Sequence, residues 1–115
     1  MKKLFFAAAT VLMLSSCVAS QPALYSWYGS ENATYQYTKR NTDDKLNAAM
    51  EQYKKVITMQ KGARGVVPPG VNAEYGYLLV KAGKKEEGLT LLKEEARLYP
   101  ESEKFISRII KQLQK

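Results

Sequence analysis

Few side chains in this sequence are suited to nucleophilic or metal chemistry. The 115 residues include one cysteine, Cys17, and no histidine. Zinc sites of the usual nitrogen and sulfur type, and Cys-His or Ser-His nucleophile pairs, are therefore excluded. The adjacent acids Glu86-Glu87 and Glu94-Glu95 point about 100° apart on a helix, so we interpret them as solvated surface. We expect no enzymatic activity, no cofactor and no metal, which leaves the thiol of Cys17.

The residues before Cys17 follow the order of a secretion signal. Met1-Lys2-Lys3 is basic, residues 4–14 are uncharged and mostly apolar, and the small residues Ser15 and Ser16 follow. A membrane-spanning helix needs about 20 apolar residues, so this shorter run favours a cleaved signal peptide over a span. Cleavage before Cys17 divides the chain into a signal peptide (1–16), a tether (17–23) and a domain (24–115).

Leu14-Ser15-Ser16-Cys17 resembles the lipobox of bacterial lipoproteins, in which an aliphatic residue and two small residues precede a cysteine. The resemblance implies that the signal peptidase recognises Leu14, Ser15 and Ser16. It also implies that the Cys17 sulfur attacks a lipid glycerol carbon to form an S-diacylglycerol thioether, after which the new amino group is acylated, for example with palmitate. Several acyl chains on one residue make membrane anchoring effectively permanent. The alternative is a free or intermolecularly bonded thiol in a secreted protein, because a lone cysteine forms no internal disulfide.

The position and charge of the mature chain suggest where it resides. Val18 follows the cysteine, and in the sorting typical of such lipoproteins the absence of Asp at this position implies the inner leaflet of the outer membrane, facing the periplasm. Cleavage removes Lys2 and Lys3, so the mature chain has 16 of the 18 basic side chains. With 11 acidic side chains, its net charge is +5. The basic residues are dispersed, which argues against nucleic acid as a partner. We interpret them as solvated helix faces, with weak attraction to anionic headgroups as the alternative.

The domain begins with an aromatic segment, Leu24-Tyr25-Ser26-Trp27-Tyr28-Gly29, which holds the only tryptophan. Amphipathic rings suit both small cores and contacts with partners or membrane interfaces. Packing against the helices is one interpretation of the segment. The other makes Tyr25, Trp27 and Tyr28 a candidate partner contact.

Hydrophobic periodicity predicts an all-α domain of antiparallel hairpins. Paired prolines place a loop at residues 62–70, while Gly83 and Pro100 mark two short turns. First-turn acids and a capping side chain mark a helix start at residues 41–44. The expected helices are 30–39, 43–61, 71–82, 85–99 and 101–113.

Each of four expected helices carries residues for burial at helical spacing. The expected core positions are Ala33 and Tyr35; Leu46, Ala49, Met50, Tyr53, Val56, Ile57 and Gln60; Leu89, Leu92, Ala96 and Tyr99; and Phe105, Ile106, Ile109, Ile110 and Leu113.

Part of the chain resembles one tetratricopeptide repeat of about 34 residues. The matching positions are Gly76, Gly83, Gly88, Leu92, Leu98 and Pro100. The sequence departs from the repeat at Tyr75, where leucine is usual, and at Glu95, where a small residue is usual and Ala96 comes one place late. The long Glu95 side chain argues against close helix packing there. The flanking helices 43–61 and 101–113 are expected to complete the stack, whose concave face would be the docking surface.

Over nearly the whole mature chain, the sequence is similar to a family of small bacterial outer-membrane lipoproteins of unknown function. The similarity lies in residues 24–28, 47–50, 67–70 and 75–78. It implies a gene that often accompanies those of a curli-secretion-channel-like lipoprotein and of another small lipoprotein, and it implies no catalytic residue. We therefore expect a lipid-anchored interaction or scaffold protein of an envelope assembly. The alternative is a pilot-type accessory factor for assembly of a secretion channel.

The lipobox assignment predicts that Cys17→Ser leaves an uncleaved, unlipidated precursor, because a hydroxyl is too weak a nucleophile for the lipid transfer. Radiolabelled palmitate should mark the wild-type protein only. Equal labelling of the serine variant would rule out Cys17 as the attachment site.

Overall fold

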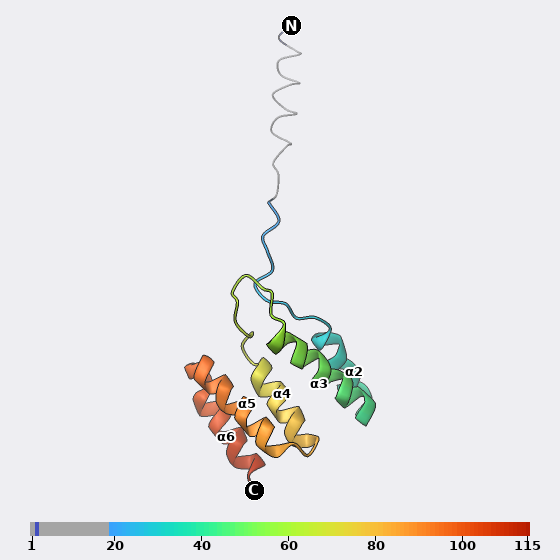
Figure 1. Ribbon diagram of the computed structural model, residues 1–115, viewed down its shortest axis with the longest axis vertical. Helices are drawn as coiled ribbons and strands as arrows, with labels where there is room; N and C mark the ends of the chain where they lie inside the picture. The colour runs from blue at the N-terminus through green and yellow to red at the C-terminus, as the bar shows by residue number, and fades with distance from the viewer. Residues whose placement is uncertain (1, 3–18) are drawn as a thin grey trace.

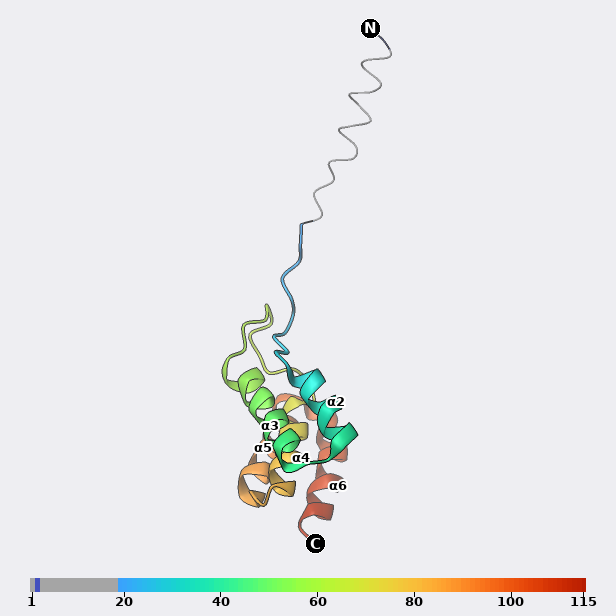
Figure 2. The same ribbon diagram turned by 90° about the vertical axis from the view of Figure 1, so that its right-hand side faces the viewer.

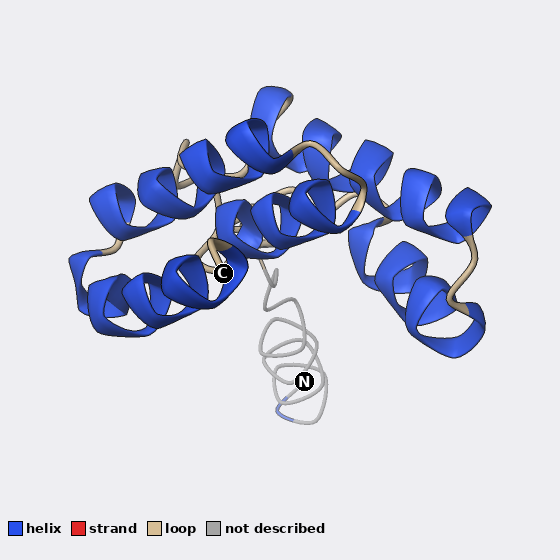
Figure 3. Cartoon of the chain, turned by 90° about the horizontal axis from the view of Figure 1, so that it is seen from below, coloured by secondary structure: helices blue, strands red, loops and turns tan. Residues whose placement is uncertain are grey.

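The computed structural model describes residue 2 and residues 19–115, and in this part of the chain helices are joined by loops with no strand (Figures 1 and 3). The predicted all-α fold is confirmed. Leu14, Ser15, Ser16 and Cys17 lie outside the described residues. The helices are α2 (Ser30–Arg40), α3 (Asp43–Thr58), α4 (Val71–Lys81), α5 (Lys85–Leu98) and α6 (Glu103–Leu113), with a 3-10 turn, η1 (Pro100–Ser102), before α6.

Helix α4 lies at the centre of the domain and packs against two cores, one formed with α3 and the other formed by α5 and α6. In Figure 2, α3 and α5 lie on one side of the molecule and α2 and α6 on the other, with α4 between them. The α3 stripe predicted from periodicity supplies most of the first core. That core contains Leu46, Ala49, Tyr53 and Val56 of α3 with Val71 and Leu78 of α4.

The α4–α5 hairpin is the closest helix pair, because glycines face each other where the helices cross. A Cβ atom added to Gly76 would lie 2.6 Å from the Gly88 carbonyl oxygen, and one added to Gly88 would collide with the Gly76 carbonyl oxygen and with Val80. Gly83 closes the turn at φ +85°, the left-handed conformation expected for it. The two helices therefore pack backbone to backbone.

The second core joins α5 to α6. Leu89 and Leu92 of α5 bury Ile106 of α6, with Ile109 and Ile110 partly buried beside them. Pro100 opens the turn before α6, as predicted. The placement of Phe105 in the core was wrong, because its side chain is 64% exposed. It lies about 100° around the helix from Ile106, which faces α5, so it points out of this interface.

Three local predictions also differ from the structure. Tyr35 is exposed, and Tyr37 packs against the first core in its place, beside Ala33. Thr42 is the N-cap of α3 but makes no capping hydrogen bond. Instead, a hydrogen bond from its side chain lowers the pKa of Asp44. Helix α3 ends at Thr58 and not at Lys61, because residues 60–64 bond to the aromatic segment, as described below.

The close crossing predicts that Gly88→Ala destabilises the domain although alanine is the better helix former. The added methyl group must push α4 and α5 apart, which should cost about 1–3 kcal/mol of unfolding free energy in a denaturant titration. Gly29→Ala is the matched control, because its Cβ would meet only the flexible end of Gln52. Equal stability of the Gly88→Ala variant and wild type would contradict the crossing.

Candidate functional site

Exposed large hydrophobic side chains gather at two places among the described residues. Tyr77 and Phe105 lie on the face that α4 and α6 share. Leu24, Trp27, Tyr28, Met59 and Val66 lie in the aromatic segment and in the loop that joins α3 to α4. Tyr35 stands apart on α2. The two groups define two candidate surfaces.

The first surface is a groove over α4, bounded by α2 and α6. It contains two adjoining hollows that share Glu74 and Tyr77 in their linings. The hollow of about 390 Å³ also contacts Phe105 and Ile109 of α6. The hollow of about 250 Å³ also contacts Tyr37 of α2. We call this surface the groove, defined by Thr34, Tyr37, Ala73, Glu74, Tyr77, Phe105 and Ile109.

A partly buried hydrogen-bond network forms the floor of the smaller hollow. The Thr34 hydroxyl donates to the Tyr53 hydroxyl at 2.8 Å, and the Tyr53 hydroxyl donates to the Glu74 carboxylate. Burial, followed by the hydrogen bond to Glu74, raises the pKa of Tyr53 to about 12. The network connects α2, α3 and α4, so it fixes the floor of the groove.

One cation lies over the tyrosines of the groove. The Lys81 Nζ atom is 5.4 Å from the ring centroid of Tyr37 and 5.8 Å from that of Tyr77. The hydrogen bond with Tyr37 raises the pKa of Lys81. The groove thus presents aromatic surface, the Glu74 carboxylate and one positive charge, which suits an amphipathic protein segment better than a small reactive substrate.

Glu95, which departs from the repeat pattern, is buried between α4 and α5. Its side chain is 2% exposed, and its Oε1 atom accepts a 2.6 Å hydrogen bond from the Gly70 amide at the start of α4. A carboxylate in this position satisfies a helix amide and complements the helix dipole. The fold accommodates the long Glu95 side chain, for which the repeat pattern has a small residue, because its carboxylate is paired with this amide.

The three predicted contact residues of the aromatic segment do not share one environment. Tyr25 is half-buried and lies close to Tyr99. Burial, followed by the neighbouring Tyr25, raises the pKa of Tyr99. Trp27 and Tyr28 are more exposed, at 39% and 42%. The Tyr25 and Trp27 rings meet edge to face with centroids 6.1 Å apart. The segment therefore packs with one ring and presents the other two.

Hydrogen bonds hold the aromatic segment against the loop after α3. Gln60 accepts from the Ser26 amide at 2.6 Å and donates to the Ser26 carbonyl at 3.2 Å. The Ala63 and Arg64 amides donate to the carbonyls of Ala23 and Leu24 at 2.9 and 3.2 Å. Tyr28 donates to the Met59 carbonyl. A Cβ on Gly62 would collide with the Leu24 backbone, so only glycine permits this approach.

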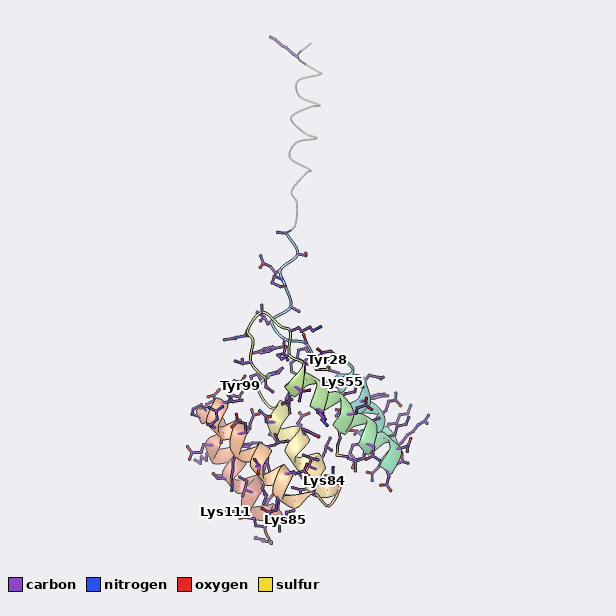
Figure 4. All side chains as sticks on the ribbon, in the orientation of Figure 1. Tyr28, Lys55, Lys84, Lys85, Tyr99 and Lys111 are labelled. Carbon is purple, nitrogen blue, oxygen red and sulfur yellow. The ribbon has the colours of Figure 1, made fainter. Side chains whose placement is uncertain are left out.

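We call the second surface the tether-end surface, defined by Leu24, Trp27, Tyr28, Met59, Lys61, Arg64 and Val66. Residues 19–23 leave the domain beside it (Figure 1). In Figure 4, Tyr28 and Tyr99 lie toward this end, whereas Lys84, Lys85 and Lys111 lie toward the other. The sequence had indicated the aromatic half of this surface but gave no sign of its partner loop.

Neither a metal-ion cluster nor a membrane-spanning helix is found among the described residues. No group of three or more Asp, Glu, Cys or His side chains within them is arranged to hold a metal ion. None of the helices there has the length and hydropathy to cross a membrane.

Comparison with known proteins gives one match. The model of a domain of unknown function, DUF4810, matches residues 24–109. Neither the curated proteins nor the solved structures include a significant match to the chain.

The network under the groove predicts a pH-dependent role for Tyr53. Its folded-state pKa is raised from about 10 to about 12, so its contribution to stability is complete below pH 10 and is lost as the pH rises through 12. Tyr53→Phe should reduce the unfolding free energy by about 1–2 kcal/mol at pH 7, and the deficit should shrink between pH 10 and 12. Tyr35→Phe, outside the network, should match wild type at pH 7. A deficit independent of pH would contradict the network.

Proposed function

From the premise that this chain belongs to the DUF4810 family, whose function is unknown, we propose that it is a lipid-anchored lipoprotein that binds another envelope protein through the groove. The anchor is Cys17, and the location is the inner leaflet of the outer membrane, facing the periplasm. The proposed partner is a component of an envelope assembly, with a curli-secretion-channel-like lipoprotein as the first candidate. The proposed role is that of a scaffold and not of an enzyme.

The exposure of Phe105 beside the fixed groove floor carries the proposal. Phenylalanine has no polar group to satisfy in water, yet this ring is 64% exposed, next to Tyr77 and a hollow of about 390 Å³. Aromatic residues are the usual anchors of protein interfaces. Because the Tyr53 network already holds the floor in place, binding would need little rearrangement of the backbone.

We further propose that α2–α3 and α4–α5 are two tetratricopeptide-like hairpins, with α6 as the closing helix. The glycine crossing at Gly76 and Gly88, the left-handed Gly83 and the turn at Pro100 support this reading. Stacked repeats of this kind present an extended concave binding face. The groove, formed mainly by α2, α4 and α6, would be that face.

A photo-crosslinking residue placed at position 105 tests the function in the native membrane. An adduct with one envelope protein is expected from position 105, and none from position 35, which is equally exposed and aromatic but outside the groove. Phe105→Ala should weaken co-purification with that protein about 30-fold, the effect of losing an interface anchor, without changing the melting temperature. Tyr35→Ala should leave co-purification unchanged.

Adducts from position 35 but not from position 105 would contradict the groove as the docking surface. Mild-detergent purification of the crosslinked partner then separates a scaffold from a pilot. A scaffold subunit stays with the mature assembly, whereas a pilot is absent from it.

A further inference from the structure

We infer that the tether-end surface lies flat against an anionic lipid headgroup layer and so fixes the orientation of the domain on the membrane. The inference takes one element from the proposed function, the anchor at Cys17. It concerns a different surface from the groove and a different ligand, phospholipid headgroups.

The tether places this end of the domain next to the bilayer. Residues 18–23 connect Cys17 to the domain, and an extended chain of six residues reaches at most about 20 Å. Residues 19–23 leave the domain beside the tether-end surface, with the loop of residues 59–70 rising next to them (Figures 1 and 2). Of the domain's two ends, this one is nearest to the anchor.

The surface has the side chains of a membrane interface. Leu24 is 58% exposed and Met59 50% exposed, although both are apolar. Trp27 and Tyr28 beside them are the residue types that favour the headgroup level. The hydrogen bonds between residues 23–28 and 59–64 hold the two halves together, so the side chains are presented as one rigid patch. Insertion would then cost little conformational entropy.

Within the two segments that form the tether-end surface, charge favours anionic lipid as the occupant. The sequence contains no acidic residue from position 52 to position 73 or from position 18 to position 30. Lys61 and Arg64, both exposed, are therefore the only charged side chains of the two paired segments, residues 19–29 and 59–70. At the far end Lys84 and Lys85 are followed directly by Glu86 and Glu87. A basic side chain at an anionic surface strengthens attraction roughly fivefold, so these two favour contact roughly thirtyfold.

This orientation leaves the groove free for a protein partner. Helices α2, α4 and α6 each begin toward the tether end and run away from it (Figure 1). A domain seated on its tether end therefore holds these helices upright on the bilayer. The groove between them then opens sideways, along the membrane surface, where another anchored protein would meet it.

Trp27 is the only tryptophan in the chain, so its fluorescence reports on this surface alone. The full-chain protein, extracted from membranes and reconstituted in vesicles of phosphatidylethanolamine and phosphatidylglycerol, should lose Trp27 fluorescence when the phospholipids are brominated near the headgroup. Lys61→Gln with Arg64→Gln should weaken this contact roughly thirtyfold, and so abolish most of the quenching. The matched pair Lys84→Gln with Lys85→Gln, at the far end, should be quenched like wild type.

Two results would overturn the inference. One is unquenched Trp27 in wild-type protein that is bound to the vesicles, as expected if the surface is kept for a protein partner. The other is equal quenching of Trp27 in the two double variants, when the circular dichroism spectra of both variants match that of wild type and so show that both are folded. The intact mass of the same sample reports separately whether Cys17 carries lipid. An unlipidated Cys17 in the mass spectrum would show that the proposed anchor is wrong. The quenching tests the surface contact separately, whether or not Cys17 is modified.

Discussion

The close approach of α4 and α5 at Gly76 and Gly88 is the constraint on which the rest of the domain depends. Because no side chain separates the two helices at the crossing, α5 lies near enough for Glu95 to reach the amide of Gly70, the N-cap residue of α4. Helix α4 is thereby held between α5 on one side and the α3 core on the other. It can then serve as the floor of the groove while its other contacts keep the protein folded. A wider crossing would remove the Glu95 contact and loosen this floor.

Much of the fold follows from residue chemistry that is visible in the sequence. Gly83 ends a helix because glycine adopts positive φ without strain. Pro100 begins a turn because its missing amide costs nothing there. The α3 stripe of Leu46, Ala49, Tyr53 and Val56 is buried as its spacing predicts. These features depend on interactions within about one helical turn, so a single sequence is enough to reveal them.

The features that the sequence did not reveal depend on contacts between distant segments. Helix α3 stops three residues early because Gln60 and the following amides bond to residues 23–26, a pairing without periodicity. Phe105 lies at the edge of the apolar face of α6, and only the position of α5 decides that Ile106 is buried and Phe105 is not. The docking surface was predicted only as the concave face of a repeat. The residues of the groove could not be listed from the sequence, because Thr34 and Glu74 become partners only through Tyr53.

We propose that the domain binds an envelope protein with the groove while its tether end rests on the membrane. Amide hydrogen exchange, compared between protein in native membranes and protein extracted in detergent, tests both contacts at once. This arrangement predicts slower amide exchange in membranes for residues 59–66 and for the groove helices α4 and α6. The amides on the outer face of α5 should exchange at the same rate in membranes and in detergent. Protection confined to α3 and α5, with residues 59–66 and α6 exchanging as in detergent, would contradict it.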